Sequence, residues 1–400
     1  MSVDCMRVRL HLRLIRVLAV LVDTVDELVV EVTSTRSWSR CPDCGFRCRA
    51  VHDTRVAKIR DLPCLGRRTT LWWRRRRFTC ANCGARHLEG HDEFGERMTR
   101  RLARALVADA GVMTIRAVAR RHGIRWHTIM ALVVGWSALV AAHRRSQRCR
   151  VLLVDETSMR RRHRYVTVLS DGETGRLLGM VPHRSAAALS GFLAEQGHRW
   201  CRHVEVVVSD GSVAYQTAIN THLGHAIHVL DRFHVARWFA VGLIQLRRQL
   251  QRRPDDQHPP VFDPELFRAR FTLLRRVEHL QDGQAAQLTR LFDTYPQLQA
   301  GWEALQWLYQ AYQAEDLDAA NEALHRFVDL YATGQLPTFD QVVERIIRWD
   351  KQIRAYHHPR AARASNGRLE GLNNLLQVLR RTAHGCTNTD NFEARGLLLA

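Results

Sequence analysis

The sequence predicts a multidomain α/β protein, on the basis of three observations. Between residue 151 and about residue 235, three apolar runs that each end on an acid alternate with helical patterns, as in a sheet flanked by helices. Two CxxC pairs precede residue 84 and indicate a small metal-binding module. From about residue 236 to 360, nearly every segment has a helical pattern with acidic and glutamine-rich faces. A chain of 400 residues is long enough for about two to four domains with their own cores.

The charge of the chain points to a polyanionic partner. The net charge is +20, and nucleic acid is the leading candidate for such a surface. A genome that favours arginine codons is an alternative, since only two lysines are present, but codon bias does not explain an excess of base over acid. Basic residues number 14 against three acidic ones from Arg36 to Arg86, whereas Leu280–Arg345 has three against ten. This asymmetry predicts a nucleic-acid-binding front and a later region with another role.

No membrane or secretory segment is expected. No apolar run approaches the roughly 20 residues that a membrane helix needs, and the N-terminus alternates apolar residues with arginine and lacks a cleavage site. Six of the ten cysteines lie in one early segment, which favours metal binding over disulfides in a chain without a secretory signal. We therefore expect a protein of the reducing cytosol.

Two CxxC pairs, each followed by a glycine, predict a structural zinc site. Each pair forms a knuckle in which a tight turn presents two thiolates, and four such sulfurs can surround one tetrahedral Zn²⁺. The predicted ligands are Cys41, Cys44, Cys80 and Cys83. Free cysteines or a redox CxxC are the alternatives, and Cys48 or Cys64 could replace one ligand. A closed site of four thiolates leaves no open position for catalysis.

The segment between the two knuckles contains WWRRRRF, which predicts a strand with arginines on both faces beside aromatic residues. Arg74 and Arg76 are candidates for contacts to DNA phosphates, although a solvated run of charge is an alternative. Residues 1 to about 36 alternate apolar and polar residues, and they predict a short β unit that leads into the metal module.

Residues 114–129 fit the spacing of a DNA-binding helix-turn-helix. Ala119 is small where the two helices would cross, Gly123 permits the turn, and Ile129 would fill the core from the second helix. Any pair of packed helices could mimic the pattern, but the basic surroundings favour DNA binding. The predicted DNA-binding residues are Arg116, Arg125, Trp126, His127 and Thr128.

Acidic residues at the ends of the apolar runs indicate a metal site. VLLVD ends on Asp155, the strands YVTVLS and LLGMV follow, and two further apolar runs end on Asp210 and Asp231. Three antiparallel strands, a helix, a strand, a helix and a strand is the ribonuclease-H-like order, in which the first and fourth strands are neighbours. Asp155 and Asp210 would then lie side by side and need a cation such as Mg²⁺ or Mn²⁺ between them. We expect Glu156 to point away, because neighbouring strand residues face opposite sides.

A third carboxylate usually completes such a site, and the candidate is Glu370. Ser365 or Asn366 would cap its helix, and Asn373 and Asn374 would lie on the same side as the glutamate. Three carboxylates can hold two metal ions that activate a water or a 3′-hydroxyl and stabilise the leaving oxygen in phosphoryl transfer.

Each acid also has a purely structural interpretation. Asp155 or Asp210 could merely cap the turn that follows it. Glu370 could be a solvated helix residue, and Asp231 could be only the N-cap of the long helix after it.

Taken in order, these motifs resemble those of insertion-sequence transposases of the ISL3 family, which have a DDE catalytic triad. The resemblance covers almost the whole chain and is carried by CPDCG, VHDTRVAKIRDLPCLG, CANCG, the helix-turn-helix, VDETSMRRRHRYVTVLSD, VVVSDGSVAY, VLDRFHVARW and SNGRLEGLNN. DRFHV and NGRLEGLNN are specific in combination. The resemblance implies a ribonuclease-H-like core with a helical insertion before the glutamate, and cutting and joining of DNA.

Carried over residue by residue, the triad of this family falls on Asp155, Asp210 and Glu370, which would be the ligands of catalytic Mg²⁺ or Mn²⁺. The DRFH pair falls on Asp231 and His234, for which we expect an auxiliary role, either orienting a metal ligand or contacting a phosphate. One departure is the Gly-Ser pair after the second aspartate, which is less bulky than expected. It removes no catalytic group.

The resemblance predicts a transposase that binds the terminal inverted repeats of its own element, cleaves the DNA strand and joins it to target DNA. Arginines 160, 161, 162 and 164 could clamp DNA beside the first aspartate. Both element ends must be held together, so a homodimer or larger synaptic complex is expected, in the bacterial cytoplasm on the nucleoid. A non-catalytic DNA-binding regulator and a nuclease that cuts without joining are the alternatives. A zinc hydrolase is excluded, because four thiolates close the zinc site.

Four parts follow from these assignments. They are a β unit with the zinc module at 1–95, a helix-turn-helix domain at 96–148, a catalytic core at 149–240 with 361–400, and a helical insertion at 241–360. A Pro-rich segment from Arg252 interrupts the helical insertion.

Overall fold

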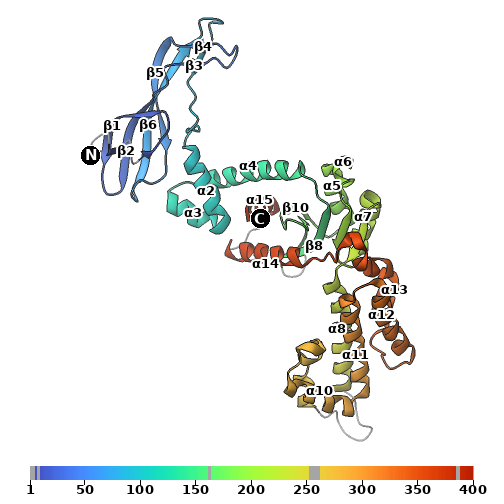
Figure 1. Ribbon diagram of the computed structural model, residues 1–400. Helices are drawn as coiled ribbons and strands as arrows, with labels where there is room; N and C mark the ends of the chain where they lie inside the picture. The colour runs from blue at the N-terminus through green and yellow to red at the C-terminus, as the bar shows by residue number, and fades with distance from the viewer. Residues whose placement is uncertain (1–4, 7–9, 161–163, 252–261, 384–387, 400) are drawn as a thin grey trace. The chain divides into compact units, whose positions relative to one another are not determined.

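The structure is a computed structural model that describes residues 5–6, 10–160, 164–251, 262–383 and 388–399. The chain has a mixed α/β architecture and divides into two compact units (Figure 1). The first unit comprises residues 1–140 and 379–399, and the second comprises residues 141–378. The four-part division of the sequence stays a prediction, and most of the Pro-rich segment lies outside the described residues.

A five-stranded sheet forms the N-terminal part of the first unit (Figure 1). Its strand order is β1 (Ile15–Asp23), β2 (Glu27–Ser34), β6 (Arg68–Thr79) and β5 (Val51–Arg60), with β7 (Arg86–Leu88) paired to β6. The strand pairs are antiparallel except β2 with β6, which is parallel. Leu28, Val30 and Val32 are fully buried along β2, so the period-2 alternation of ELVVEVTS determines which face packs on the core.

Helices complete the first unit. They are α2 (Arg100–Val112), α3 (Ile115–His122), most of α4 (Trp126–Arg145) and α15 (Thr389–Leu399). Arg395 of α15 donates hydrogen bonds from Nη2 to the carbonyl oxygens of Ala110 and Met113, at 3.3 Å and 2.9 Å. The C-terminal helix of the chain therefore lies against the end of α2, where these donors satisfy carbonyl groups that have no partner within the helix.

Helix α4 is the one helix among the described residues that is long and apolar enough, by length and composition alone, to cross a membrane. The helix is not a continuous apolar run, so it does not contradict the expectation that no apolar run approaches this length. Polar residues such as His127 and Ser137 interrupt the apolar runs of α4 without making the helix polar on average. A single such helix is a weak indication, because core helices of globular proteins meet the same criteria.

A second five-stranded sheet forms the centre of the second unit (Figure 1). Its strand order is β10 (Leu177–Pro182), β9 (Arg164–Asp171), β8 (Val151–Arg160), β11 (Val206–Ser209) and β12 (Ile227–Leu230). The first three strands are antiparallel, and β8, β11 and β12 are parallel. β8 pairs with β11 only as far as Leu153, whereas it pairs with β9 as far as Arg160. Beyond Leu153, β8 is therefore not paired with β11.

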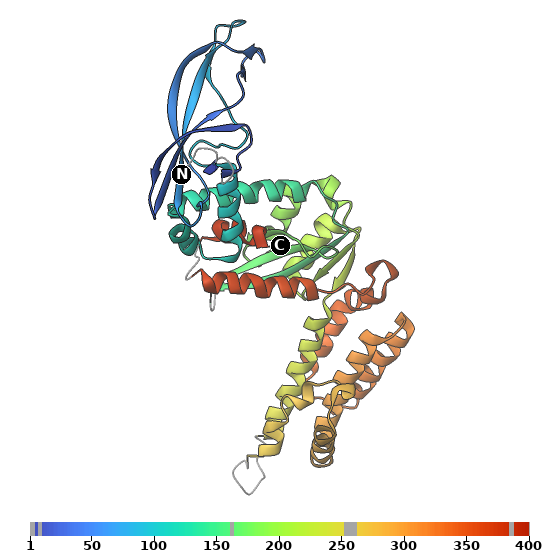
Figure 2. The same cartoon turned by 60° about the vertical axis from the view of Figure 1, so that its left-hand side comes forward.

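Helices α5 (Ala186–Gln196), α6 (His198–Cys201) and α7 (Val213–Leu223) connect the strands, and α14 (Gly367–Thr382) returns to the sheet from the far end of the chain. Leu152 and Val154 of β8 share one buried core with Leu189 and Leu193 of α5. Figure 2 shows α14, in red, running alongside the sheet, and Gln377 of this helix donates a hydrogen bond to the carbonyl oxygen of Ser158 in β8 at 2.9 Å.

The remainder of the second unit is helical, as the sequence predicts. The helices are α8 (Arg232–Gln251), α9 (Pro264–Arg268), α10 (Asp282–Thr294), α11 (Pro296–Gln313), α12 (Leu317–Ala332) and α13 (Asp340–Arg354), with 3₁₀ turns at Thr272–Leu274, Val277–His279, Ala355–His357 and Pro359–Ala361. The rings of Phe239, Phe327 and Phe339 pack together with centroids 4.7 to 6.2 Å apart. Phe239 belongs to α8, which starts directly after β12, so α8 links the last strand of the sheet to this aromatic core.

Candidate active site and metal centres

Two cysteine knuckles in the first unit bring four sulfur atoms together. One lies between the short strands β3 (Ser39–Arg40) and β4 (Arg47–Cys48), and the other lies between β6 and β7. In each knuckle the glycine N–H donates to the carbonyl oxygen of the first cysteine at 2.9 Å. These glycines, Gly45 and Gly84, have φ of +74° and +76°, a backbone region that glycine adopts without the strain other residues incur. This requirement explains the sequence pattern CxxCG.

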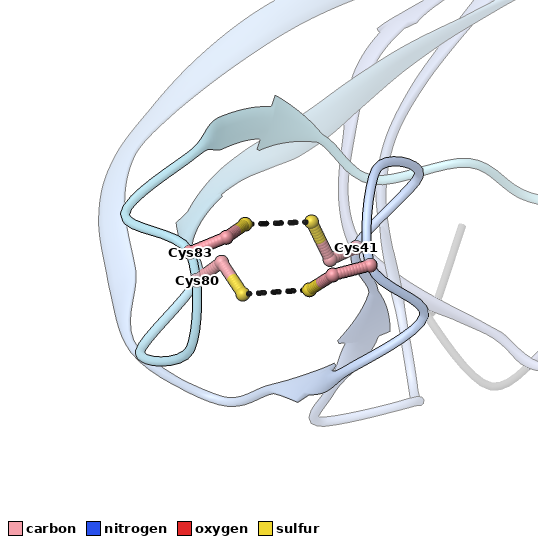
Figure 3. A group of neighbouring side chains, drawn as sticks. Cys41, Cys80 and Cys83 are labelled. Atoms are coloured by element: carbon pink, nitrogen blue, oxygen red, sulfur yellow. Dashed lines mark hydrogen bonds between the residues drawn. The ribbon is translucent and has the colours of Figure 1, made fainter.

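The four sulfur atoms fit a zinc ion. The Sγ atoms of Cys41, Cys44, Cys80 and Cys83 all lie within 4.8 Å of one another. The facing pairs Cys41–Cys83 and Cys44–Cys80 are 3.7 Å and 3.5 Å apart, and Figure 3 shows Cys41 turned toward the opposite knuckle. Sulfur atoms about 2.3 Å from a tetrahedral Zn²⁺ would be ~3.8 Å from one another. The cluster therefore supports a structural zinc site.

The two other early cysteines lie outside this group. Cys48 is buried beside Cys41 and Cys80, but its thiol points at the carbonyl oxygen of Phe46, 3.5 Å away. Cys64 packs at the edge of the core of the first sheet. The geometry thus brings together the four cysteines that the CxxC spacing singles out.

The two strand arginines are each paired with a carboxylate. Arg74 is exposed, and its Nε lies 2.6 Å from Oε1 of Glu31. Arg76 has a side chain only 18% exposed, and its Nη2 lies 2.6 Å from Oε2 of the buried Glu89. Arg76 also donates to the carbonyl oxygen of Arg36 at 2.5 Å. Much of the charge of Arg76 is therefore neutralised inside the first unit.

Helices α3 and α4 lie at the position of the predicted helix-turn-helix and share a buried core with α2. Thr114 begins α3 by accepting a hydrogen bond from Ala117 N–H at 3.0 Å, and Gly123 ends it with φ of +59°. Val118 and Ile129 are fully buried between the helices, as expected for Ile129. The side chains that remain exposed include Arg116, Arg125, Trp126, His127 and Thr128. The start of α4 thus presents four consecutive side chains to a partner.

A cavity of about 320 Å³ lies where β8, the start of α8 and the start of α14 meet in the second unit. Its lining residues are Asp155, Glu156, Asp231, Phe233, His234, Arg237, Asn366 and Glu370. Four of these eight residues are carboxylates, and they come from segments up to 215 positions apart in sequence. The strand order explains this convergence, because β8 and β12 flank β11 and run parallel to it, so their carboxyl ends lie at the same edge.

Asp155 lies at the centre of this arrangement. Its side chain is 15% exposed, with Oδ1 3.9 Å from Nε2 of His234. Oδ2 accepts a hydrogen bond from Nδ2 of Asn373 at 2.9 Å. Burial raises the pKa of Asp155 to about 6, and the negative charges of Asp210 and Asp231 add to this shift, while His234 partly offsets it.

Asp231 and Asn366 connect the strand end to the last helix. Asp231 is 2% exposed, and its Oδ1 accepts a hydrogen bond from Asn366 N–H at 3.0 Å. Asn366 Nδ2 donates in turn to the carbonyl oxygen of Val154 at 3.1 Å. The backbone carbonyl of Asp231 accepts from His234 N–H, so Asp231 also occupies the position that begins α8. Burial raises the pKa of Asp231, and the charge of Glu370 contributes.

Glu370 lies in the first turn of α14 and lines the cavity. Its N–H donates to the carbonyl oxygen of Asn366 at 2.8 Å, which makes Asn366 the residue before the helix, as predicted. The side chain of Asn366 binds Val154 instead of capping the helix. Asn373 faces the first aspartate, whereas Asn374 is exposed, so the two asparagines expected on one side have different surroundings.

Asp210 is held by an arginine. It is 2% exposed, its Oδ2 accepts from Nη2 of Arg184 at 2.7 Å, and its Oδ1 accepts from Ser212 N–H at 3.1 Å. Asp210 is close enough to raise the pKa of Asp155 but does not line the cavity. Among the described residues, the four cysteines are the one group of three or more candidate ligands whose atoms lie within 4.8 Å of one another. The carboxylates of Asp155, Asp210 and Glu370 are therefore less closely grouped than that.

The expectation that Glu156 points away from this site is wrong. Glu156 lines the cavity beside Asp155, and its Oε2 lies 2.5 Å from Nε of Arg184. Strand alternation sets the direction of Cβ, but β8 is unpaired on the β11 side beyond Leu153. The glutamate side chain is long enough to reach Arg184, which also pairs with Asp210.

The glycine after the second aspartate has a steric cause. A Cβ atom at Gly211 would lie 2.7 Å from Cζ2 of Trp238 in α8. The bulkier residue expected at this position would therefore collide with the indole, and Gly211 allows α8 to approach the end of β11 closely.

The donor set suits a divalent cation of the magnesium type. All candidate ligands are carboxylate or amide oxygens, which Mg²⁺ and Mn²⁺ prefer. Burial raises the pKa of Asp155 and of Asp231, with a smaller contribution from neighbouring carboxylates, and a cation between the carboxylates would stabilise their charged forms. Of the arginines considered as a DNA clamp, Arg161 and Arg162 and the side chains of Arg160 and Arg164 lie outside the described residues.

Comparison with known proteins identifies the family. Residues 152–396, well over half of the chain, match the DDE transposase family ISL3, described as "Transposase". The chain is a transposase of the ISL3 family. Residues 39–83 of the transposase also match the "zinc-finger of transposase IS204/IS1001/IS1096/IS1165", in agreement with the four-cysteine cluster.

The curated relatives of the chain are named as transposases. The transposase is 28% identical over 360 residues to the "Transposase for insertion sequence element IS1001" of Bordetella parapertussis, covering 88% of this chain and 86% of that protein. It is 26% identical over 290 residues to the "Transposase for insertion sequence element IS1557" of Mycobacterium tuberculosis, covering 67% of this chain and 64% of that protein. The transposase therefore belongs to a family of enzymes that cleave and transfer DNA, which favours the predicted enzyme over the alternative of a non-catalytic regulator.

Proposed function

We propose that this transposase uses Asp155, Asp210 and Glu370 to hold the divalent cations of DNA strand cleavage and strand transfer. The observation that carries the proposal is the cavity at the edge of the second sheet, where acids from β8, from the end of β12 and from α14 converge. Asp210 is close to this cavity, because its charge helps to raise the pKa of Asp155 and because it pairs with the same arginine as Glu156. The strand order of β8 to β12 supports a ribonuclease-H-like core.

In this proposal the protein side chains have separate roles. Asn373 fixes the orientation of Asp155, and Asn366 fixes that of Asp231, each through a hydrogen bond. Asp231 and His234 are auxiliary, and His234 is placed to orient the first aspartate or to contact a phosphate. Bound Mg²⁺ or Mn²⁺ would activate the attacking water or 3′-hydroxyl and stabilise the leaving oxygen. The basic residues of the chain would neutralise DNA phosphates, which phosphoryl transfer requires as much as in-line geometry.

We propose further that the α3–α4 pair is a helix-turn-helix that binds the terminal inverted repeats together with the zinc module. The exposed side chains at the start of α4 support this, because the first residues of a recognition helix are those that enter the major groove. Joining two element ends requires a homodimer or larger complex, and DNA binding implies a cytoplasmic protein on the nucleoid.

Labelled element-end DNA incubated with Mg²⁺ tests the catalytic assignment. Asp155→Asn, Asp210→Asn and Glu370→Gln should each lower cleavage by about 100-fold or more and leave DNA binding intact. Glu195→Gln, on an exposed position of α5, is the matched control and should cleave at the wild-type rate. Wild-type cleavage in any one of the three variants would exclude that residue from the site.

The same assay separates a transposase from a nuclease that cuts without joining. A pre-cleaved end with a free 3′-hydroxyl should be joined to a second duplex, and the product is longer than either substrate. Cleavage without any joined product would indicate a nuclease and contradict the proposal.

A further inference from the structure

Arg184 connects a carboxylate of β8 with one that directly follows β11. It lies just before α5, and its Nε is 2.5 Å from Oε2 of Glu156 while its Nη2 is 2.7 Å from Oδ2 of Asp210. Glu156 lines the cavity, and Asp210 does not. The guanidinium therefore occupies the space between the cavity and the second acid of the proposed triad.

Both carboxylate oxygens of Asp210 accept hydrogen bonds. Oδ2 accepts from Arg184 and Oδ1 accepts from Ser212 N–H, in a side chain that is 2% exposed. A cation that binds Asp210 must share or replace the guanidinium, because both are positive and both would use Oδ2. Asp155 differs, because its Oδ2 has the neutral amide of Asn373 as partner.

The backbone around Arg184 is fixed, but its side chain is accessible. His183 N–H donates to the carbonyl oxygen of Tyr165, and the carbonyl oxygen of His183 accepts from Thr167 Oγ1 at 2.8 Å. Ser185 caps α5 by accepting from Ala188 N–H at 3.1 Å. The Arg184 side chain is 39% exposed, so its guanidinium can move from Asp210 to an anion in solvent without any movement of the chain.

We propose that Arg184 is a positioning residue that competes with the divalent cation for Asp210 and transfers to a DNA phosphate when the cation binds. The inference rests on the proposed function, since it assumes that Asp210 is a cation ligand. The proposal couples the binding of DNA to the binding of the cation. A phosphate that attracts Arg184 frees Asp210, so bound DNA raises the affinity for the cation. The bound cation must then raise the affinity for DNA by the same factor.

Mn²⁺ binding to the full chain tests the proposal without requiring catalysis. Free Mn²⁺ is measured by electron paramagnetic resonance, in titrations without DNA. Arg184→Gln should bind Mn²⁺ about tenfold more tightly than the wild type or better, because even water-screened repulsion between a guanidinium and a nearby divalent ion has that effect. A residue that merely maintains the structure would give weaker binding when replaced.

Matched variants make the result specific. Arg199→Gln removes the same charge from an exposed position of α6 and should change the Mn²⁺ affinity less than about twofold. Arg184→Lys, which keeps the charge but cannot bridge two carboxylates as a guanidinium does, should lie between wild type and Arg184→Gln. This variant also provides the test if Arg184→Gln does not fold.

The outcomes separate this inference from the proposed function. If Asp155→Asn loses Mn²⁺ binding, but the Mn²⁺ affinity does not rise in a folded Arg184→Gln or Arg184→Lys, the competition between Arg184 and the cation is overturned and the proposed cation site stands. Mn²⁺ binding in Asp155→Asn equal to the wild type overturns the proposed cation site, and the competition with it. Addition of duplex DNA should raise Mn²⁺ affinity in the wild type and not in Arg184→Gln, and equal gains in both would contradict the transfer to phosphate.

Discussion

Replacing Asp155 by asparagine should stabilise the fold while it abolishes catalysis. Asparagine is nearly the same shape, and its side-chain oxygen can still accept the hydrogen bond that Asn373 donates to Oδ2 of Asp155. What the substitution removes is a negative charge that is mostly buried and close to Asp210 and Asp231. Functional sites commonly carry such a stability penalty.

The magnitude follows from the pKa of Asp155, which is raised from 3.8 to about 6. A folded-state pKa above the unfolded value means that the folded state binds the proton more tightly. The favourable contribution is fully present below pH 3.8 and is lost as the pH rises through about 6. A shift of about 2 units corresponds to ~3 kcal/mol at pH 8, which is the upper limit of what Asp155→Asn can restore.

Thermal melting in buffer without Mg²⁺ tests this prediction. For a unit of roughly 150–250 residues, each kcal/mol changes Tm by about 2–4 °C, so Asp155→Asn should melt several degrees higher than the wild type at pH 8. A strong chelator is left out, because it would also remove zinc. At pH 5 the difference should fall to about half, because the folded carboxyl is mostly protonated while the unfolded one still ionises, and it should vanish only below pH 3.8. An equal or lower Tm for Asp155→Asn at pH 8, or a gain that does not shrink at pH 5, would refute the reasoning.

Four further predictions concern other parts of the chain. Cys80→Ser, or removal of zinc by a chelator, should unfold the knuckles and abolish DNA binding, and zinc analysis of the wild type should give a single ion per chain; full DNA binding without zinc would contradict the structural role. Gly211→Ala should destabilise the second unit by about 1–3 kcal/mol because its Cβ would meet Trp238, whereas Gly191→Ala, which meets no atom within 4 Å, should melt no lower than the wild type. Arg76→Gln should lower stability by about 3–5 kcal/mol because the buried carboxylate of Glu89 loses its cationic partner. Arg125→Ala should instead weaken DNA binding measured by fluorescence anisotropy and leave Tm unchanged. A lower Tm for Arg125→Ala, or an unchanged Tm for Arg76→Gln, would contradict the exposed position of Arg125 and the buried ion pair of Arg76.

Local pattern was sufficient to predict the strands and turns that carry the site. The runs from residues 151 to 230 alternate with helices as the sequence indicates, and the segment DGETGR forms the turn between β9 and β10, with Asp171 Oδ1 accepting from Glu173 N–H at 2.8 Å. The glycines of the two knuckles signal the cysteine cluster, because positive φ is required there. These features depend on neighbours within a few positions in the chain, which is the range over which sequence patterns act.

Features that depend on distant partners were not predictable in this way. Arg184 is one arginine among many, and its partners lie 26 and 28 positions away in different strands. Asn366 has the sequence context of a helix cap, but a carbonyl 212 positions away binds its side chain instead. Glu156 alternates with Asp155 along β8, but its ion pair with Arg184 holds its side chain at the cavity. Tertiary competition for a hydrogen bond or a charge decided each of these cases.

The convergence of Asp155, Asp210 and Glu370 around a divalent cation can be tested by iron-directed cleavage of the protein itself. Fe²⁺ that replaces Mg²⁺ generates hydroxyl radicals, which cut the backbone within a few ångströms of the ion, and mass spectrometry locates the cuts. The account predicts cuts near all three positions, suppressed by excess Mg²⁺ and absent in Asp155→Asn. Cuts near residues 155, 231 and 370 with none near 210, under conditions that support DNA cleavage, would contradict it.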